Sequence, residues 1–124
     1  MKNLLDTHTI LWFLNGEILS SKTRDLIING ENYISVVSLW EIAIKMNIGK
    51  YSFDGGFSSF RELVKNNGFE ILPIEDEYIK RLFALPLIHR DPFDRLIIAT
   101  ALAKDLTIIT IDENIQKYDI KWVW

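Results

Sequence analysis

Residues 89–103 read HRDPFDRLIIATALA, a charged segment with one proline followed by an almost entirely apolar run. Asp91 is suited to cap a helix, and Pro92 suits the first helical position because an N–H there has no partner within the helix. Asp94 falls in the first turn, where the helix dipole favours a carboxylate. From residue 96 onward the segment is apolar on every face, which predicts a core helix covered on both sides. The acids at its start therefore stand on a rigid support.

Apolar runs and helically spaced segments alternate along the rest of the chain. Strands are expected at residues 3–6, 33–35, 69–74, 106–110 and 120–123, and Pro73 restricts the third of these to an edge or to its end. Helices are expected at residues 7–14, from Ser20 or Ser21 to 28, and at 37–48, 59–66, 75–85 and 92–103, with one further turn capped by Asp112. This alternation predicts an α/β fold with a parallel sheet covered on both faces.

Two pairs of residues have the spacing of a capping box. Ser59 and Glu62 predict that a helix opens at Ser59, and the sequence Asn-Asn-Gly at 66–68 closes it. Ser38 and Glu41 show the same spacing. For Glu41 a second structural explanation is an ion pair with Lys45, four residues further on.

Composition limits the classes of protein to consider. The chain has 124 residues, 48% of them hydrophobic, which suits a single domain over 1–124. The net charge of −3 argues against nucleic-acid binding through a broad basic face, so such a partner would need local cations or a metal. The absence of cysteine excludes disulfides and thiol chemistry and fits a reducing cytosol. Because Asp6 and His8 interrupt the apolar N-terminal segment, we expect no export signal, no membrane association and a cytoplasmic location.

Four acids fall where a parallel sheet binds ligands. Asp6 ends the first strand, Glu41 lies early in the helix after the second, and Asp94 opens the helix before the fourth. Asp112 lies just beyond the fourth strand. Ligands bind at the carboxyl ends of such strands, where the strand order reverses. If strands one and four are neighbours, Asp6 and Asp112 meet at that point.

Each acid alone is explained as a helix cap or a surface ion pair. Four carboxylates converging on one crevice, however, would repel one another strongly unless they were protonated or neutralised by a cation. Hard oxygen ligands of this kind suit Mg²⁺ or Mn²⁺. The joint pattern therefore favours a metal site.

The histidines, arginines and tryptophans give weaker indications of a functional site. His8 and His89 lack a third imidazole partner, so a zinc site built on histidines is disfavoured. Both histidines are expected either in loops or in contact with the acidic residues rather than with a metal. Arg90 and Arg95 flank the central acids and either bind phosphate or pair with nearby carboxylates. The four tryptophans are expected in the core or at an interface.

At this point four motifs resemble one known family. They are LLDTHT around Asp6, SLWEI around Glu41, HRDPFDRLIIA around Asp94 and TID ending at Asp112, followed by a closing segment from Tyr118 to Trp124. Together and in this order they resemble the PIN-domain nucleases, specifically the VapC-type toxins of bacterial toxin–antitoxin pairs. The resemblance runs from the first strand to the terminal tryptophan.

The resemblance implies a three-layer α/β/α PIN-like fold with a central, mostly parallel sheet. It makes Asp6, Glu41, Asp94 and Asp112 the catalytic, metal-binding cluster, with Mg²⁺ or Mn²⁺ as the cofactor. Asp6 and Asp94 would be the principal ligands, and Glu41 would bind metal or orient a water molecule. The residues that would contact metal water or substrate are Thr7, Ser38, Arg95 and Thr110, together with Asp91, which either caps its helix or assists the metal.

The expected activity is a metal-dependent endoribonuclease that hydrolyses RNA phosphodiester bonds. The resemblance also implies a cognate antitoxin that lies across an apolar groove and the active site, and a toxin homodimer. One alternative is a magnesium-dependent phosphatase or phosphoacceptor domain with Asp6 as nucleophile, disfavoured because no second acid stands two residues after Asp6. Another is a non-catalytic binding module whose acids merely cap helices.

Overall fold

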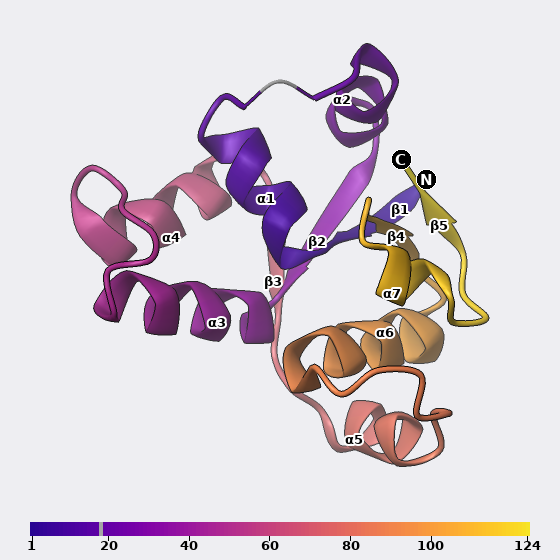
Figure 1. Cartoon of the computed structure of the whole chain (residues 1–124). Helices are drawn as coiled ribbons and strands as arrows, with labels where there is room; N and C mark the ends of the chain where they lie inside the picture. The colour runs from indigo at the N-terminus through magenta and orange to yellow at the C-terminus, as the bar shows by residue number, and fades with distance from the viewer. Residues whose placement is uncertain (18) are drawn as a thin grey trace.

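The core of the molecule is a five-stranded parallel sheet with the strand order β3-β2-β1-β4-β5 (Figure 1). The computed structural model describes residues 1–17 and 19–124. The strands are β1 (Lys2–Leu5), β2 (Glu31–Ser35), β3 (Glu70–Leu72), β4 (Thr107–Ile109) and β5 (Trp122–Val123). The central strand β1 pairs with β2 on one side and with β4 on the other. The strand order thus reverses between β1 and β4, which meets the condition under which Asp6 and Asp112 are expected to lie together.

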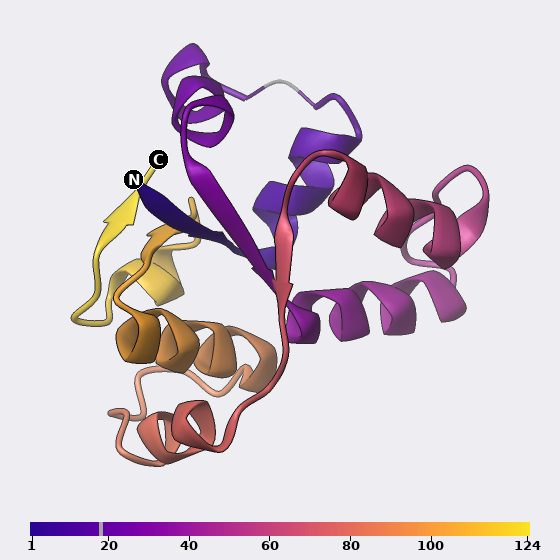
Figure 2. The same ribbon diagram turned by 180° about the vertical axis from the view of Figure 1, so that it is seen from behind.

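Seven helices of the described residues cover the two faces. They are α1 (Thr7–Leu14), α2 (Ser21–Ile28), α3 (Val36–Asn47), α4 (Gly56–Asn66), α5 (Asp76–Phe83), α6 (Pro92–Lys104) and α7 (Glu113–Gln116). Figures 1 and 2 show α1, α2 and α4 on one side of the sheet and α5, α6 and α7 on the other. This is the three-layer α/β/α arrangement expected of a PIN-like fold. No helix of the described ranges has the length and apolar character needed to cross a bilayer.

Alternation along the strands divides the core between the two faces. Leu5, Ile34 and Ile109 pack under α1 to α4, whereas their neighbours Leu4, Tyr33 and Ile108 pack under α6 and α7. Successive strand residues point to opposite faces, so strands covered on both sides are apolar throughout. The sheet is therefore fixed in register by burial on both of its faces.

The opening of α6 forms as the sequence predicts. Asp91 is the N-cap, its side chain accepts a hydrogen bond from the Asp94 backbone N–H at 3.0 Å, and Pro92 occupies the first turn. The residues from Ile97 to Ala101 are all buried. The acids before them are thus anchored to one of the least mobile parts of the core.

Two helix starts differ from the predicted capping boxes. The helix predicted to open at Ser59 begins at Gly56, after Gly55 adopts a φ of 85°, so Ser59 lies inside the helix. Helix α3 is capped by Ser35, whose side chain accepts from the Val37 N–H at 3.1 Å. In both cases a residue upstream supplies the turn, and the serine of the predicted box is left within the helix.

Candidate active site

Asp6 stands at the carboxyl end of the central strand and caps α1. Its Oδ1 accepts hydrogen bonds from the Thr9 backbone N–H at 2.8 Å and from Thr9 Oγ1 at 2.6 Å. Its Oδ2 accepts a hydrogen bond from Thr110 Oγ1, which comes from the end of β4. Burial raises the pKa of Asp6, and the hydrogen bonds from Thr110 and Thr9 oppose that rise. Because a carboxylate oxygen can accept two bonds, Oδ2 retains room for one further ligand.

A second buried group lies beside Asp6 and connects α1 with α3. Thr7 Oγ1 lies 2.7 Å from Glu41 Oε1 and 3.0 Å from Ser38 Oγ. The other carboxylate oxygen of Glu41 accepts from Lys45 Nζ at 2.8 Å, so the predicted ion pair is present. Burial works to lower the pKa of Lys45, but the hydrogen bond and charge of Glu41 outweigh it and leave that pKa raised. Glu41 is thus held at both ends of its carboxylate.

Asp112 lies near Asp6 through a shared hydroxyl group. Its backbone N–H donates to Thr110 Oγ1 at 3.0 Å, and Thr110 in turn contacts Asp6. The Asp112 side chain caps α7 by accepting from the Asn114 N–H at 2.8 Å. Because β1 and β4 pair directly, the two acids flank the point where the strand order reverses, as the sequence predicts.

Asp94 faces the other acids from the first turn of α6. Its pKa is raised to about 7, first by burial, then by the charge of Asp91 and, to a smaller extent, by the charges of Asp112 and Glu41, while a hydrogen bond from His89 opposes the rise. The contact with His89 joins Nε2 to Asp94 Oδ2 at 3.2 Å. A carboxylate with so high a pKa in an acidic surrounding is a typical feature of a functional site.

The structure therefore places the four predicted acids around one end of the sheet. Within residues 1–17 and 19–124, however, no three His, Asp or Glu side chains form a ready-made metal-binding group. Instead, Thr110 joins Asp6 to the Asp112 backbone, and the charges of Asp112 and Glu41 act on Asp94. Burial of Asp6 and crowding of Asp94 both disfavour the ionised carboxylates, which a divalent cation would offset. The donor set thus fits Mg²⁺ or Mn²⁺ in chemistry.

The residues predicted to assist the four acids differ in what they contact. Thr7, Ser38 and Thr110 are all buried. Thr7 contacts Glu41 and Thr110 contacts Asp6, whereas Ser38 contacts Thr7. Their contact with metal-bound water or substrate stays a prediction. Asp91 caps α6. Arg95 donates to Tyr118 Oη at 2.9 Å and to the Pro86 carbonyl at 3.0 Å. Its hydrogen bonds therefore hold the loop before α6.

Two side chains that hold the acids, directly or through another residue, had little signal in the sequence: Thr9 and Tyr118. Thr9 bonds to Asp6, and the spacing of a capping residue with a threonine three positions later points to it. Tyr118 contacts His89 Nδ1 at 2.8 Å from a position 29 residues away, which no local pattern reveals. His89 lies behind Asp94, as expected, whereas His8 is exposed and its ring lies 5.8 Å from that of Trp12.

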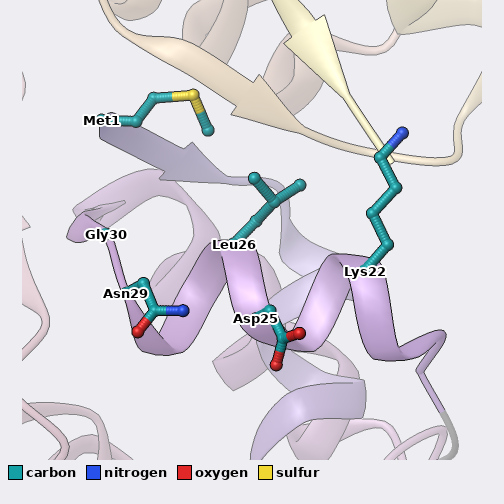
Figure 3. A pocket seen from close by; sticks show the side chains of 6 residues that line it. All are labelled: Met1, Lys22, Asp25, Leu26, Asn29 and Gly30. Carbon is teal, nitrogen blue, oxygen red and sulfur yellow. The ribbon is translucent and has the colours of Figure 1, made fainter.

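A hollow lies at the other end of the sheet. It is formed by α2, the turn after it and the first residue of the chain (Figure 3), and it is lined by Met1, Lys22, Asp25, Leu26, Asn29 and Gly30. Met1 precedes the start of β1, whereas Asp6 follows its end. This hollow is therefore separate from the acids.

Comparisons with known proteins identify the family and the fold. The family model described as the PIN domain matches residues 4–121. No curated protein matches the chain.

Solved structures with the same fold include the VapBC2 complex of Rickettsia felis bound to a DNA fragment from its promoter, at 18% identity over 99% of this chain and 98% of that chain, with a TM-score of 0.78. The DNA-bound VapBC of Salmonella typhimurium has 17% identity over 99% and 97% and a TM-score of 0.72. A toxin–antitoxin complex from Klebsiella pneumoniae has 20% identity over 98% and 96% and a TM-score of 0.68. Because the family model spans nearly all of the chain, from β1 to the residue before β5, this protein belongs to the PIN-domain family.

Proposed function

We propose that this chain is the toxin of a type II toxin–antitoxin pair and acts as a Mg²⁺- or Mn²⁺-dependent endoribonuclease. The observation that carries the proposal is the gathering of Asp6, Glu41, Asp94 and Asp112 at one end of a PIN-domain sheet, with Asp6 and Glu41 buried. PIN domains are nucleases, so hydrolysis of a phosphodiester bond is the reaction class that this family supports.

The chain's own residues would divide the work among them. Asp6 and Asp94 would be the principal ligands of the cation, and Asp112 would complete the set. Glu41, held by Thr7 and Lys45, would bind the cation or accept a proton from the attacking water. When bound, a divalent cation makes a water molecule more acidic and stabilises charge on the phosphate. Thr9 and Thr110 keep the Asp6 carboxylate in place.

The proposed partners follow from the same comparisons. One solved structure with this fold is described as a toxin–antitoxin complex and another as a member of the VapBC family of toxin–antitoxin systems, which supports a cognate antitoxin here. Exposed apolar side chains beside the acids suit an antitoxin segment lying across the site: Trp40 is 58% exposed and packs edge-on against Phe93 at 5.1 Å. A toxin homodimer is part of the same proposal.

Cleavage of RNA by the purified protein tests the proposed activity. We expect cleavage with Mg²⁺ or Mn²⁺ and none with EDTA, and a loss of at least about 100-fold in Asp6→Asn and Asp94→Asn. Sequencing of RNA ends after brief expression of the wild type and of Asp94→Asn would then identify the cleaved positions. Full activity in either variant would contradict the assignment.

The matched control is Asp76→Asn on α5. Asp76 is also an acid in the first turn of a helix, but its side chain is 81% exposed and pairs only with Lys80. Its substitution is expected to leave cleavage unchanged. Cleavage of single-stranded DNA at the rate found for RNA would contradict the ribonuclease assignment while leaving a nuclease in place.

A further inference from the structure

A directed chain of hydrogen bonds leads from the C-terminal segment to Asp94. Tyr118 Oη lies 2.8 Å from His89 Nδ1, and His89 Nε2 lies 3.2 Å from Asp94 Oδ2. Arg95 Nη1 lies 2.9 Å from the same tyrosine oxygen. Tyr118 is 4% exposed, and the side chains of His89 and Asp94 are 13% and 17% exposed, so water competes little for these bonds.

The donors and acceptors in this chain are fixed by their chemistry. Arginine only donates, so the oxygen of Tyr118 accepts from Arg95, and the His89 backbone N–H approaches that oxygen as a second donor at 3.4 Å. The hydroxyl proton of Tyr118 is then left for His89 Nδ1. A neutral imidazole with Nδ1 as acceptor carries its proton on Nε2, which faces the Asp94 carboxylate.

We propose that Tyr118 and His89 are positioning residues for Asp94. Tyr118, itself held by Arg95, selects the Nε2–H tautomer of His89, and His89 donates that proton to Asp94 Oδ2. Among the hydrogen bonds of residues 1–17 and 19–124, Asp94 Oδ1 takes part in none, so it remains available to a cation. This inference rests on the proposed role of Asp94 as a ligand. Partners of this kind behind a metal ligand commonly change metal affinity by roughly 10- to 100-fold.

The tautomer of His89 can be read directly by NMR. The chain has two histidines, so a protein labelled with ¹⁵N in its histidine rings gives two sets of long-range ¹H–¹⁵N correlations, and His8→Gln assigns them. In the metal-free protein at pH 8.5 we expect the Nε2–H pattern for His89. A Tyr118→Phe variant should show a mixture of tautomers. An Nδ1–H or doubly protonated ring in the wild type, or an unchanged pattern in the variant, would overturn the proposal.

Mn²⁺ affinity supplies the second measurement. Titration calorimetry should show a loss of roughly 10- to 100-fold in Tyr118→Phe. The matched control is Tyr33→Phe, which removes the hydroxyl of another buried tyrosine that donates to Glu31 at 2.6 Å, away from the acids. If Tyr118→Phe does not fold, Arg95→Met tests the same step, because it removes the donor that orients the tyrosine hydroxyl. Unchanged Mn²⁺ affinity in a variant whose tautomer has changed would also overturn the proposal.

The two proposals fail in different ways. The tautomer is observed without RNA or metal, so a protein that cleaves no RNA but shows the Tyr118-dependent Nε2–H form would contradict the nuclease assignment alone. A protein whose cleavage depends on Asp94 but whose His89 is indifferent to Tyr118 would contradict the positioning role alone.

Discussion

The folded state disfavours the ionised form of the Asp94 carboxylate. Burial and the charges of Asp91, Asp112 and Glu41 raise its pKa from 3.8 to about 7. Below pH 3.8 the group is protonated in both the folded and the unfolded chain, and the stability associated with it is fully present. Between pH 3.8 and about 7 the unfolded chain releases the proton first, so this stability is lost as the pH rises.

Asp94→Asn should therefore stabilise the metal-free protein at alkaline pH. We expect the free energy of unfolding to rise by on the order of 2 kcal/mol at pH 8.5 relative to the wild type, after allowance for solvent screening, and this difference to shrink by pH 4. Urea denaturation in EDTA at both pH values measures it, with the exposed Asp76→Asn as control. An equal difference at both pH values would show that charge repulsion is not the cause.

Thr110→Val tests the hydroxyl that lies between Asp6 and Asp112. The hydrogen bond from Thr110 lowers the pKa of Asp6, so its removal should raise that pKa further and let protons compete better with a cation. We expect a loss of roughly 10-fold or more in Mn²⁺ affinity by calorimetry.

Thr100→Val is the control, because Thr100 is also buried but donates only to the Leu96 carbonyl within α6. An equal loss of Mn²⁺ affinity in the two variants would assign the effect to general packing.

Sequence patterns located the acids and one ion-pair partner, Lys45, but not the contact of Tyr118 with His89. Asp6 and Asp112 were predictable because apolar runs mark the ends of β1 and β4, and parallel pairing brings those ends together. The contact of Tyr118 with His89 depends on the path of the loop before α6 and on two rotamers. Neither of these leaves a periodic trace in the sequence.

At the scale of whole elements, two variants at the start of α6 distinguish a capping role of Asp91 from a metal-binding role. Asp91→Ala removes the hydrogen bond to the Asp94 N–H and should cost about 1 kcal/mol of unfolding free energy. Asp91→Asn keeps that bond while removing the charge, so it should retain both stability and cleavage. Denaturation curves and RNA cleavage of the two variants decide between the roles. Loss of cleavage in Asp91→Asn would make Asp91 a ligand rather than a cap.

Most element positions followed from apolar periodicity, whereas some boundaries did not. Pro73 restricted β3 to an edge or to its end, and β3 both lies at the edge of the sheet and ends at Leu72, just before Pro73. The extent of α1 was predicted, because the Asn-Gly pair at 15–16 is a strong local signal. The start of α4 was wrong, because Gly55 turns the chain in a left-handed conformation upstream of Ser59. A capping-box spacing identifies a local preference, and a glycine turn earlier in the chain can override it.

At the scale of the molecule, the net charge of −3 predicts that the proposed RNA binding depends on a cation. We expect affinity for a single-stranded RNA to fall at least roughly 10-fold when EDTA replaces a divalent ion. Fluorescence anisotropy with Ca²⁺, which resembles Mg²⁺ as an oxygen-binding cation, separates binding from cleavage.

The control for this measurement is a monovalent salt of matched ionic strength, which screens charge without entering the acids. RNA affinity that is unaffected by EDTA would show that a cation-independent surface holds the nucleic acid.

The hydrogen bond from Thr110 to Asp6 spans 104 residues, from the end of β4 to the end of β1. The central strand likewise acquires its second neighbour only when residues 107–109 are available. Asp6 and Asp112 are therefore brought together by contacts between residues that are far apart in the sequence. Any fragment that stops before Thr110 lacks both this hydroxyl and Asp112. A chain truncated before Thr110 is therefore expected to lack the proposed site, although it contains Asp6, Glu41 and Asp94.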